Sequence, residues 1–167
     1  MNNDEKFMKI ALQEANKAFK KEEIPVGAII VKDGEIIAKA HNIKEEKNDA
    51  TAHAEIEVIK KASKKLKRWR LNDCVMYINL EPCFMCMGAI MEARIGRLVY
   101  SLSDNKRGAA KTVIDFSKIN KYHKIQIDSG ICMNESKELI QNFFRILRDK
   151  RKNNEQSTIW TKFWGRI

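Results

Sequence analysis

The sequence lacks any long apolar run, any internal repeat and any low-complexity linker. Without about 20 consecutive apolar residues it offers no candidate membrane-spanning helix. No apolar segment follows a basic patch at Met1–Lys6, so we expect no signal peptide and a cytoplasmic protein. Cysteine is scarce as well, with 4 residues in 167. In an intracellular setting a C-x-x-C pair favours metal binding or free thiols over a disulfide.

Length and composition favour one domain. The 167 residues, 44% of them hydrophobic, suffice for a single core. The net charge of +10 has two interpretations, a general lysine bias or an anionic partner. Much of the charge is concentrated in two stretches that are able to meet phosphate, residues 60–70 and 145–152.

The apolar pattern predicts alternating helices and strands. Helical spacing predicts helices over 4–20, 54–65, from about 82, and 135–150. Runs of branched residues predict strands at 26–31, 36–40, 75–80, 97–101 and 124–128. Asp33-Gly34 is a strong hairpin turn signal, and residues 42–49 read as a polar loop. This order indicates an α/β domain with helices on both faces of a mixed sheet.

Two short motifs carry the chemistry, His53-Ala54-Glu55 and Pro82-Cys83-Phe84-Met85-Cys86. One imidazole and two thiolates are three protein ligands, the number that a catalytic zinc ion keeps while its fourth position stays open. A structural zinc site normally has four, and the remaining cysteines and histidines form no second pair: Cys74, Cys132, His41 and His123. A C-x-x-C alone would favour a structural or incidental interpretation. With the adjacent Glu55, the pattern is the signature of zinc-dependent deaminases.

The spacing makes a geometric prediction. Cys83 and Cys86 are three apart, so at the start of a helix they project from the same side and feel the positive end of its dipole. Positions two apart on a helix point to nearly opposite sides. His53 and Glu55 therefore reach one centre only if His53 lies at a non-helical cap.

At such a centre, zinc would make water nucleophilic near neutral pH, and Glu55 would move its proton to the ring nitrogen of a base and help ammonia to leave.

Several segments together resemble the bacterial tRNA-specific adenosine deaminases, which belong to the cytidine deaminase superfamily and convert the wobble adenosine of an anticodon to inosine. The match spans about residues 7–152. Its segments are Glu23–Ala28, His41-Asn42, Thr51–Ile56, Trp69–Leu71, Leu80–Ala89, Arg94–Arg97, Gly108–Ala110 and Phe143–Arg145. After Gly108–Ala110 the family tends to continue with Gly-Ser, whereas this chain has Lys111-Thr112, near the expected RNA-facing loop.

The resemblance implies a three-layer α/β/α sandwich around a five-stranded mixed sheet, one Zn2+ per subunit and a homodimer. It implies one zinc-dependent deaminase domain over residues 1–154, with a tail of unassigned role at 155–167. The implied site consists of the zinc ligands His53, Cys83 and Cys86, the proton shuttle Glu55, and the substrate-binding residues Glu23, Asn42, Phe144, Arg145 and Arg148.

The segment Phe143–Arg145 matches the start of the family's final helix, which holds the tRNA anticodon stem-loop. Phe144 would stack on a splayed base, and Arg145 and Arg148 would meet phosphate or base edges. We expect at least one of the two phenylalanines to be a core residue instead.

Two other functions fit the motifs. A deaminase of a free base such as guanine or cytosine shares both zinc motifs but needs no basic helix outside its pocket. A zinc-stabilised RNA-binding module without catalysis has no use for Glu55.

Overall fold

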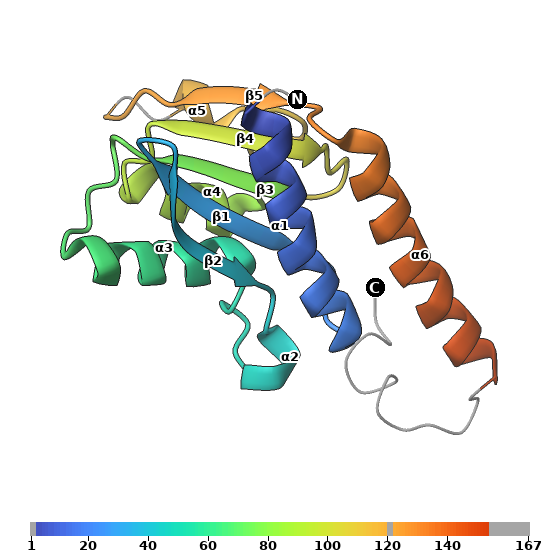
Figure 1. The fold of residues 1–167 in the computed structure, drawn as a ribbon. Helices are drawn as coiled ribbons and strands as arrows, with labels where there is room; N and C mark the ends of the chain where they lie inside the picture. Colours follow the sequence, from blue (N-terminus) through green and yellow to red (C-terminus); the bar gives the residue numbers. More distant parts are fainter. Residues whose placement is uncertain (1–2, 120–121, 154–167) are drawn as a thin grey trace.

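Helices and strands alternate along the chain (Figure 1). The computed structural model describes residues 3–119 and 122–153, so the tail at 155–167 lies outside the described residues. The elements are α1 (Asn3–Lys20), β1 (Gly27–Lys32), β2 (Glu35–His41), α2 (Lys44–Lys47), α3 (Ala54–Leu66), β3 (Val75–Leu80), α4 (Phe84–Glu92), β4 (Arg97–Leu102), α5 (Phe116–Ile119), β5 (Gln126–Ser129) and α6 (Met133–Asn153).

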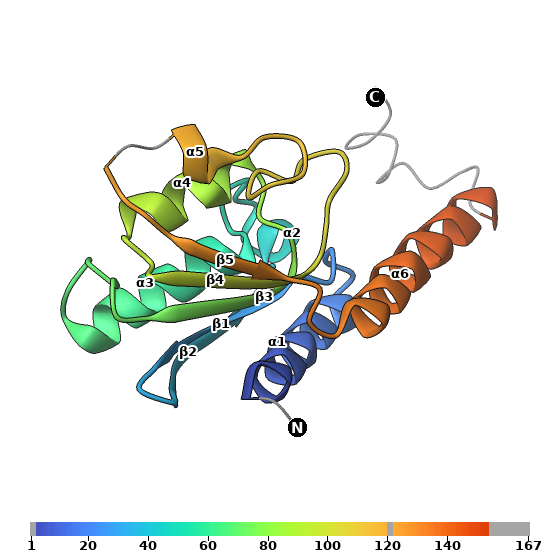
Figure 2. The same cartoon turned by 90° about the horizontal axis from the view of Figure 1, so that it is seen from above.

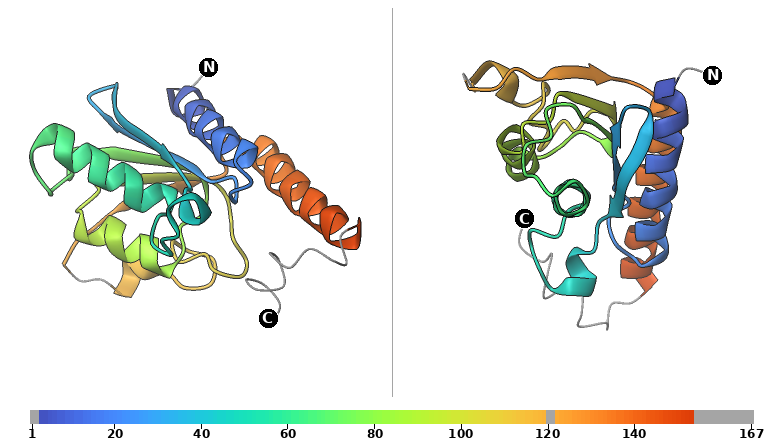
Figure 3. Two further views of the ribbon diagram at one scale, coloured as in Figure 1. Left: turned by 90° about the horizontal axis from the view of Figure 1, so that it is seen from below. Right: turned by 60° about the vertical axis from the view of Figure 1, so that its left-hand side comes forward.

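The five strands form one mixed sheet in the order β2-β1-β3-β4-β5. The pairs β2–β1 and β1–β3 are antiparallel, and β3–β4 and β4–β5 are parallel. Helices α1 and α6 lie on one face and α3 and α4 on the other (Figures 2 and 3). The predicted three-layer α/β/α sandwich is confirmed. None of the helices within 3–119 and 122–153 is long and apolar enough to cross a membrane.

The predicted hairpin turn joins β1 to β2. Asp33 and Gly34 both have positive φ, 49° and 79°. Two central residues of positive φ match the twist of the flanking strands, which explains why Asp-Gly is favoured here.

Each central strand contributes to two cores. In β1, Ala28 and Ile30 pack in the cluster beneath α3 and α4, whereas Ile29 and Val31 pack against α1. Successive side chains of a strand point to opposite faces, so a strand covered on both sides is apolar throughout.

The parallel pair β3–β4 determines where the site lies. Both strands end at the same edge of the sheet, so the segment after β3 and the loop after β4 meet there, and the Glu81 N–H donates to the Leu102 carbonyl at 2.8 Å. Helix α4 begins immediately after β3.

The structure differs from the sequence-based outline at three helices, one of which, the one-turn helix α5, was not predicted. The predicted loop at 42–49 contains the one-turn helix α2, and the final helix begins at Met133, ahead of the predicted residue 135. The expectation that Phe143–Arg145 starts this helix is therefore wrong, since the segment lies in its middle.

Candidate active site

His53 and Glu55 lie at the start of α3. His53 is the N-cap residue, with extended φ and ψ of −78° and 153°, and Glu55 is in the first turn. The extended cap breaks the helical spacing between the two residues. The predicted condition for both side chains to reach one centre, a non-helical His53, is confirmed.

Cys83 and Cys86 occupy the equivalent place on α4. Cys83 is the N-cap, with φ −73° and ψ 174°, and Cys86 is in the first turn. The Nδ1 atom of His53 lies 3.4 Å from the Cys86 Sγ and 3.9 Å from the Cys83 Sγ. All three ligand atoms lie within 4.8 Å of one another. The two helix starts thus bring together the three predicted ligands.

This donor set fits zinc. Around a tetrahedral zinc ion, with bonds of about 2.0 Å to nitrogen and about 2.3 Å to sulfur, neighbouring ligand atoms lie about 3.5 to 3.8 Å apart. The two sulfur–nitrogen distances bracket that range. Hydrogen bonds from Cys86 and from His53 lower the pKa of the Cys83 thiol to about 3, toward the thiolate that binds metal.

Glu55 is buried beside these ligands, with 3% of its surface exposed. Burial raises the pKa of its carboxyl to about 7. Its Oε2 atom is buried and accepts no hydrogen bond from any residue that the structure describes. Buried carboxylate oxygens are normally bonded, so an unpartnered one next to metal ligands fits a group that exchanges protons with a substrate.

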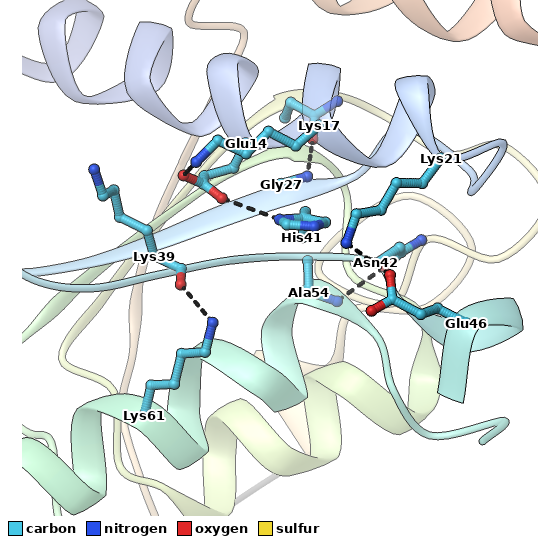
Figure 4. Close-up of polar contacts among 11 residues, drawn as sticks. Glu14, Lys17, Lys21, Gly27, Lys39, His41, Asn42, Glu46, Ala54 and Lys61 are labelled. Atoms are coloured by element: carbon cyan, nitrogen blue, oxygen red, sulfur yellow. Dashed lines mark hydrogen bonds and ion pairs between the residues drawn. The ribbon is translucent and has the colours of Figure 1, made fainter. Parts of the chain in front are cut away.

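Asn42 follows β2 and joins two backbone segments. Its amide nitrogen donates to the Ile24 carbonyl at 3.1 Å. Its Oδ1 accepts the Ala54 N–H at 2.9 Å, as Figure 4 shows. The second bond holds the start of α3 next to His53. An amide has two donor hydrogens and two acceptor lone pairs, so Asn42 keeps one of each for a further partner.

Glu23 is also buried, with 2% of its surface exposed. One of its carboxylate oxygens, Oε1, accepts the backbone N–H groups of Glu45 and Glu46 at 2.8 and 2.9 Å. N–H groups in the first turn of a helix have no acceptor within that helix, so Glu23 caps α2 from a distant part of the chain.

The two phenylalanines of α6 divide as expected. Phe143 is 5% exposed and packs edge-on against Phe19, with ring centroids 5.8 Å apart, whereas Phe144 is 40% exposed. Arg145 and Arg148 are exposed on the same helix, and Arg145 donates to Asn142 at 2.7 Å. The prediction that at least one phenylalanine belongs to the core is confirmed by Phe143.

One large cavity is lined by all of the predicted site residues except Cys86. Its volume is about 1740 Å³, and its walls come from the segment around Glu23, the starts of α3 and α4, the loop after β4, and α6. A smaller cavity of about 340 Å³ near Cys132 and Met133 contains none of the predicted ligands.

Sequence reasoning missed one wall of the cavity, Glu81 and the residues Asp104, Asn105, Lys106 and Arg107. They follow the carboxyl ends of neighbouring parallel strands, where α/β proteins commonly bind ligands. The sequence analysis did not predict that β3 and β4 are neighbouring parallel strands. It therefore could not predict that the residues after their carboxyl ends share one wall of the cavity.

The chain has recognisable relatives. It matches the family model of the MafB19-like deaminases over residues 1–148. It is 41% identical over 153 residues to the tRNA-specific adenosine deaminase of Bacillus subtilis (strain 168), covering 91% of this chain and 95% of that protein.

Similar solved structures include two deaminases. One comes from a study of A-to-I editing by tRNA deaminases at the wobble position of transfer RNA, with a TM-score of 0.76, 43% identity, and coverage of 80% of this chain and 97% of that one. The other is a guanine deaminase from Bacillus subtilis, with a TM-score of 0.59, 39% identity, and coverage of 75% and 83%.

Proposed function

The chain belongs to the family of tRNA-specific adenosine deaminases, within the cytidine deaminase superfamily, and we propose that it is a zinc hydrolase that converts the wobble adenosine of a tRNA anticodon to inosine. The observation that carries this proposal is the buried, unpartnered oxygen of Glu55 beside three metal-binding side chains. With tRNA as the substrate, the proposed site of action is the cytoplasm.

His53, Cys83 and Cys86 would hold the zinc ion. When bound, the zinc ion would act as a Lewis acid and would make water a nucleophile near neutral pH. Glu55 takes the proton of the attacking water and delivers it to the adenine ring nitrogen next to the amine-bearing carbon. It then takes the remaining proton of the added hydroxyl group and transfers it to the departing amino group, so that the C6 carbonyl forms as ammonia leaves. One C–O bond forms and one C–N bond breaks, so adenosine and water give inosine and ammonia.

The remaining cavity residues would bind the RNA. Asn42 has one donor and one acceptor left for the target nucleotide, and the exposed Phe144 can stack on a splayed base. Glu23 would shape this wall by holding α2. A volume of about 1740 Å³ exceeds the ~300–1,000 Å³ of ordinary small-ligand pockets, which supports a macromolecular substrate.

We extend the proposal to the organisation of the chain. Residues 1–154 form one deaminase domain, and two copies associate as a homodimer, as the family resemblance implies. Sedimentation of the zinc-loaded protein tests the dimer, and a monomer at assay concentrations would reject it.

A second candidate function is deamination of a free base, which the similarity to a guanine deaminase favours. One experiment with three substrates separates the tRNA deaminase from the free-base deaminase. The zinc-loaded protein is incubated with an anticodon stem-loop carrying wobble adenosine, with free adenosine, and with guanine, and the products are identified by mass. Inosine in the stem-loop alone supports the proposal, whereas turnover of guanine alone overturns it.

Ionic strength tests the RNA-binding face. If α6 contacts phosphate, Arg148→Ala weakens stem-loop binding. Log affinity then falls less steeply with log salt concentration, by about 1 in the magnitude of the slope. Lys39→Ala is the matched control, because Lys39 is an exposed cation on β2 that lies outside both charged stretches and does not line the cavity. Equal effects of the two substitutions would indicate non-specific attraction and argue against a contact through α6.

A further inference from the structure

Glu81 is a third buried carboxylate at the cavity, after Glu55 and Glu23; it is 3% exposed and lies in the segment between β3 and Cys83. Its Oε1 accepts the backbone N–H groups of Lys111 and Thr112 at 2.9 and 3.0 Å. Its Oε2 accepts the Asp104 N–H at 3.0 Å and the Thr112 hydroxyl. Each oxygen thus accepts two hydrogen bonds, the full capacity of a carboxylate.

All four donors come from the loop that follows β4. Asp104 is near its start and Thr112 near its end, so a single side chain closes the loop at both ends. Between them, the Asp104 side chain accepts the N–H groups of Lys106 and Arg107, and its carbonyl accepts that of Gly108. The Ala109 N–H donates to the Pro82 carbonyl at 2.9 Å. The loop therefore lies against the segment that leads into Cys83.

Gly108 is required by this contact. A Cβ atom at residue 108 would lie 2.3 Å from the Glu81 Oε2 and 2.6 Å from the Asp104 carbonyl oxygen. Both distances are far below van der Waals contact. Only glycine lets the loop approach the carboxylate this closely.

The same contacts explain the departure from the family pattern at Lys111-Thr112. Neither residue lines the cavity. Thr112 directs its N–H and its hydroxyl to Glu81, and the Lys111 ammonium donates to the Ile127 carbonyl at 3.1 Å. The pair was expected near the RNA-facing loop, and it lies at the end of the loop that carries Asp104–Arg107, where it bonds to Glu81 and not to the cavity.

We propose that Glu81 is a positioning residue for substrate binding: it fixes the loop 104–112 against the ligand-bearing start of α4. This inference rests on the proposed function for its substrate. The loop carries Asp104, Asn105, Lys106 and Arg107, which form one wall of the cavity opposite α6. Loss of the hydrogen bonds between Glu81 and the loop would change the distance between this wall and Cys83, and with it the fit of a bound nucleotide.

Glu81→Gln is the first test. Glutamine has the same shape, but its NH2 group replaces an oxygen that accepts two hydrogen bonds and so faces donors. We expect bound zinc to be unchanged, KM for the stem-loop to rise roughly tenfold with a smaller change in kcat, and faster amide hydrogen exchange in residues 104–112. Glu35→Gln, at an exposed glutamate on β2, is the control and should match the wild type.

Thr112 provides an independent pair of variants. Thr112→Val removes only the hydroxyl and should raise KM and loop exchange by less than Glu81→Gln, whereas Thr112→Ser keeps the hydroxyl and should restore wild-type values. If Glu81→Gln fails to fold, the Thr112 pair decides. Unchanged KM and unchanged loop exchange in Thr112→Val would then overturn the proposal, as would the same result in a folded Glu81→Gln.

Hydrogen exchange also separates this proposal from the proposed function. If the wild type deaminates guanine and not the stem-loop, the tRNA assignment fails, and KM is measured with guanine instead. Faster loop exchange with a raised KM for guanine would still support Glu81 as the positioning residue.

Discussion

Glu55 and Glu81 line the same cavity and are equally buried, yet their carboxylates differ in their hydrogen bonds. Each Glu81 oxygen accepts two hydrogen bonds, all from one loop, whereas one Glu55 oxygen has no hydrogen-bond partner among the described residues. A carboxylate that accepts four hydrogen bonds is held in one place, and it fixes the segments that donate to it. A carboxylate with a free oxygen can accept a proton and return it.

Glu23 provides an intermediate case. It is as buried as the other two, but only one of its oxygens, Oε1, accepts the backbone N–H groups of Glu45 and Glu46 in α2. Substitution by glutamine distinguishes the three. A glutamine keeps one acceptor oxygen, which is enough at residue 23, insufficient at residue 81, and unable to move protons at residue 55.

The largest expected effect is that of Glu55→Gln. Loss of the proton shuttle should lower kcat for the stem-loop by about 10²- to 10⁴-fold, with zinc still bound. Turnover and metal content of the same preparation provide the measurement. If zinc is lost together with activity, Glu55 supports the metal site and its contrast with Glu81 no longer holds. Full activity in a zinc-loaded Glu55→Gln would instead support a binding module.

A smaller effect is expected at Glu23. Glu23→Ala removes both hydrogen bonds to α2 and should raise KM roughly tenfold, whereas Glu23→Gln should stay within about twofold of the wild type. Steady-state kinetics on the stem-loop measure both. Equal loss in the two variants would mean that the charge of Glu23 contacts substrate, as the family resemblance implied, and that its role is not limited to capping α2.

The elements that the sequence predicts well are those whose signals are local. The helices α1 and α3 follow from apolar periodicity and the strands β1 to β4 from runs of branched residues, and the spacing of His53 to Glu55 set the condition, a non-helical cap, that the structure meets. Helix α2 escaped prediction because Glu23 caps it from 22 and 23 residues away. The role of Glu81 was missed for the same reason, since its donors are 23 to 31 residues distant. Likewise, only the contact with Phe19 shows that Phe143 is the core residue and Phe144 the exposed one.

The smallest effect on activity is expected at Asp4, a carboxylate that accepts three hydrogen bonds and lies far along the chain from the His53 and Cys83 motifs. Arg97 donates to both Asp4 oxygens at 2.9 and 2.8 Å, and the Tyr77 hydroxyl donates at 2.7 Å, which ties α1 to β3 and β4. The hydrogen bond from Arg97 is the largest cause of the lowered pKa of Asp4. Because the pKa is lower in the folded state, this stabilisation is fully present above about pH 4, the unfolded-state value, and is lost as the pH falls through the folded-state pKa.

Asp4→Asn should therefore lower the free energy of unfolding by about 1 to 2 kcal/mol at pH 7, with the difference from wild type shrinking in acid and kcat/KM unchanged in the folded protein. Urea unfolding at a series of pH values measures the effect. Asp33→Asn is the control, because the Asp33–Lys32 ion pair is exposed and contributes little. A loss of activity in folded Asp4→Asn would show that a hydrogen-bonded carboxylate outside the cavity also acts on the site. Lining the cavity would then no longer separate residues that position the substrate from residues that only stabilise the fold.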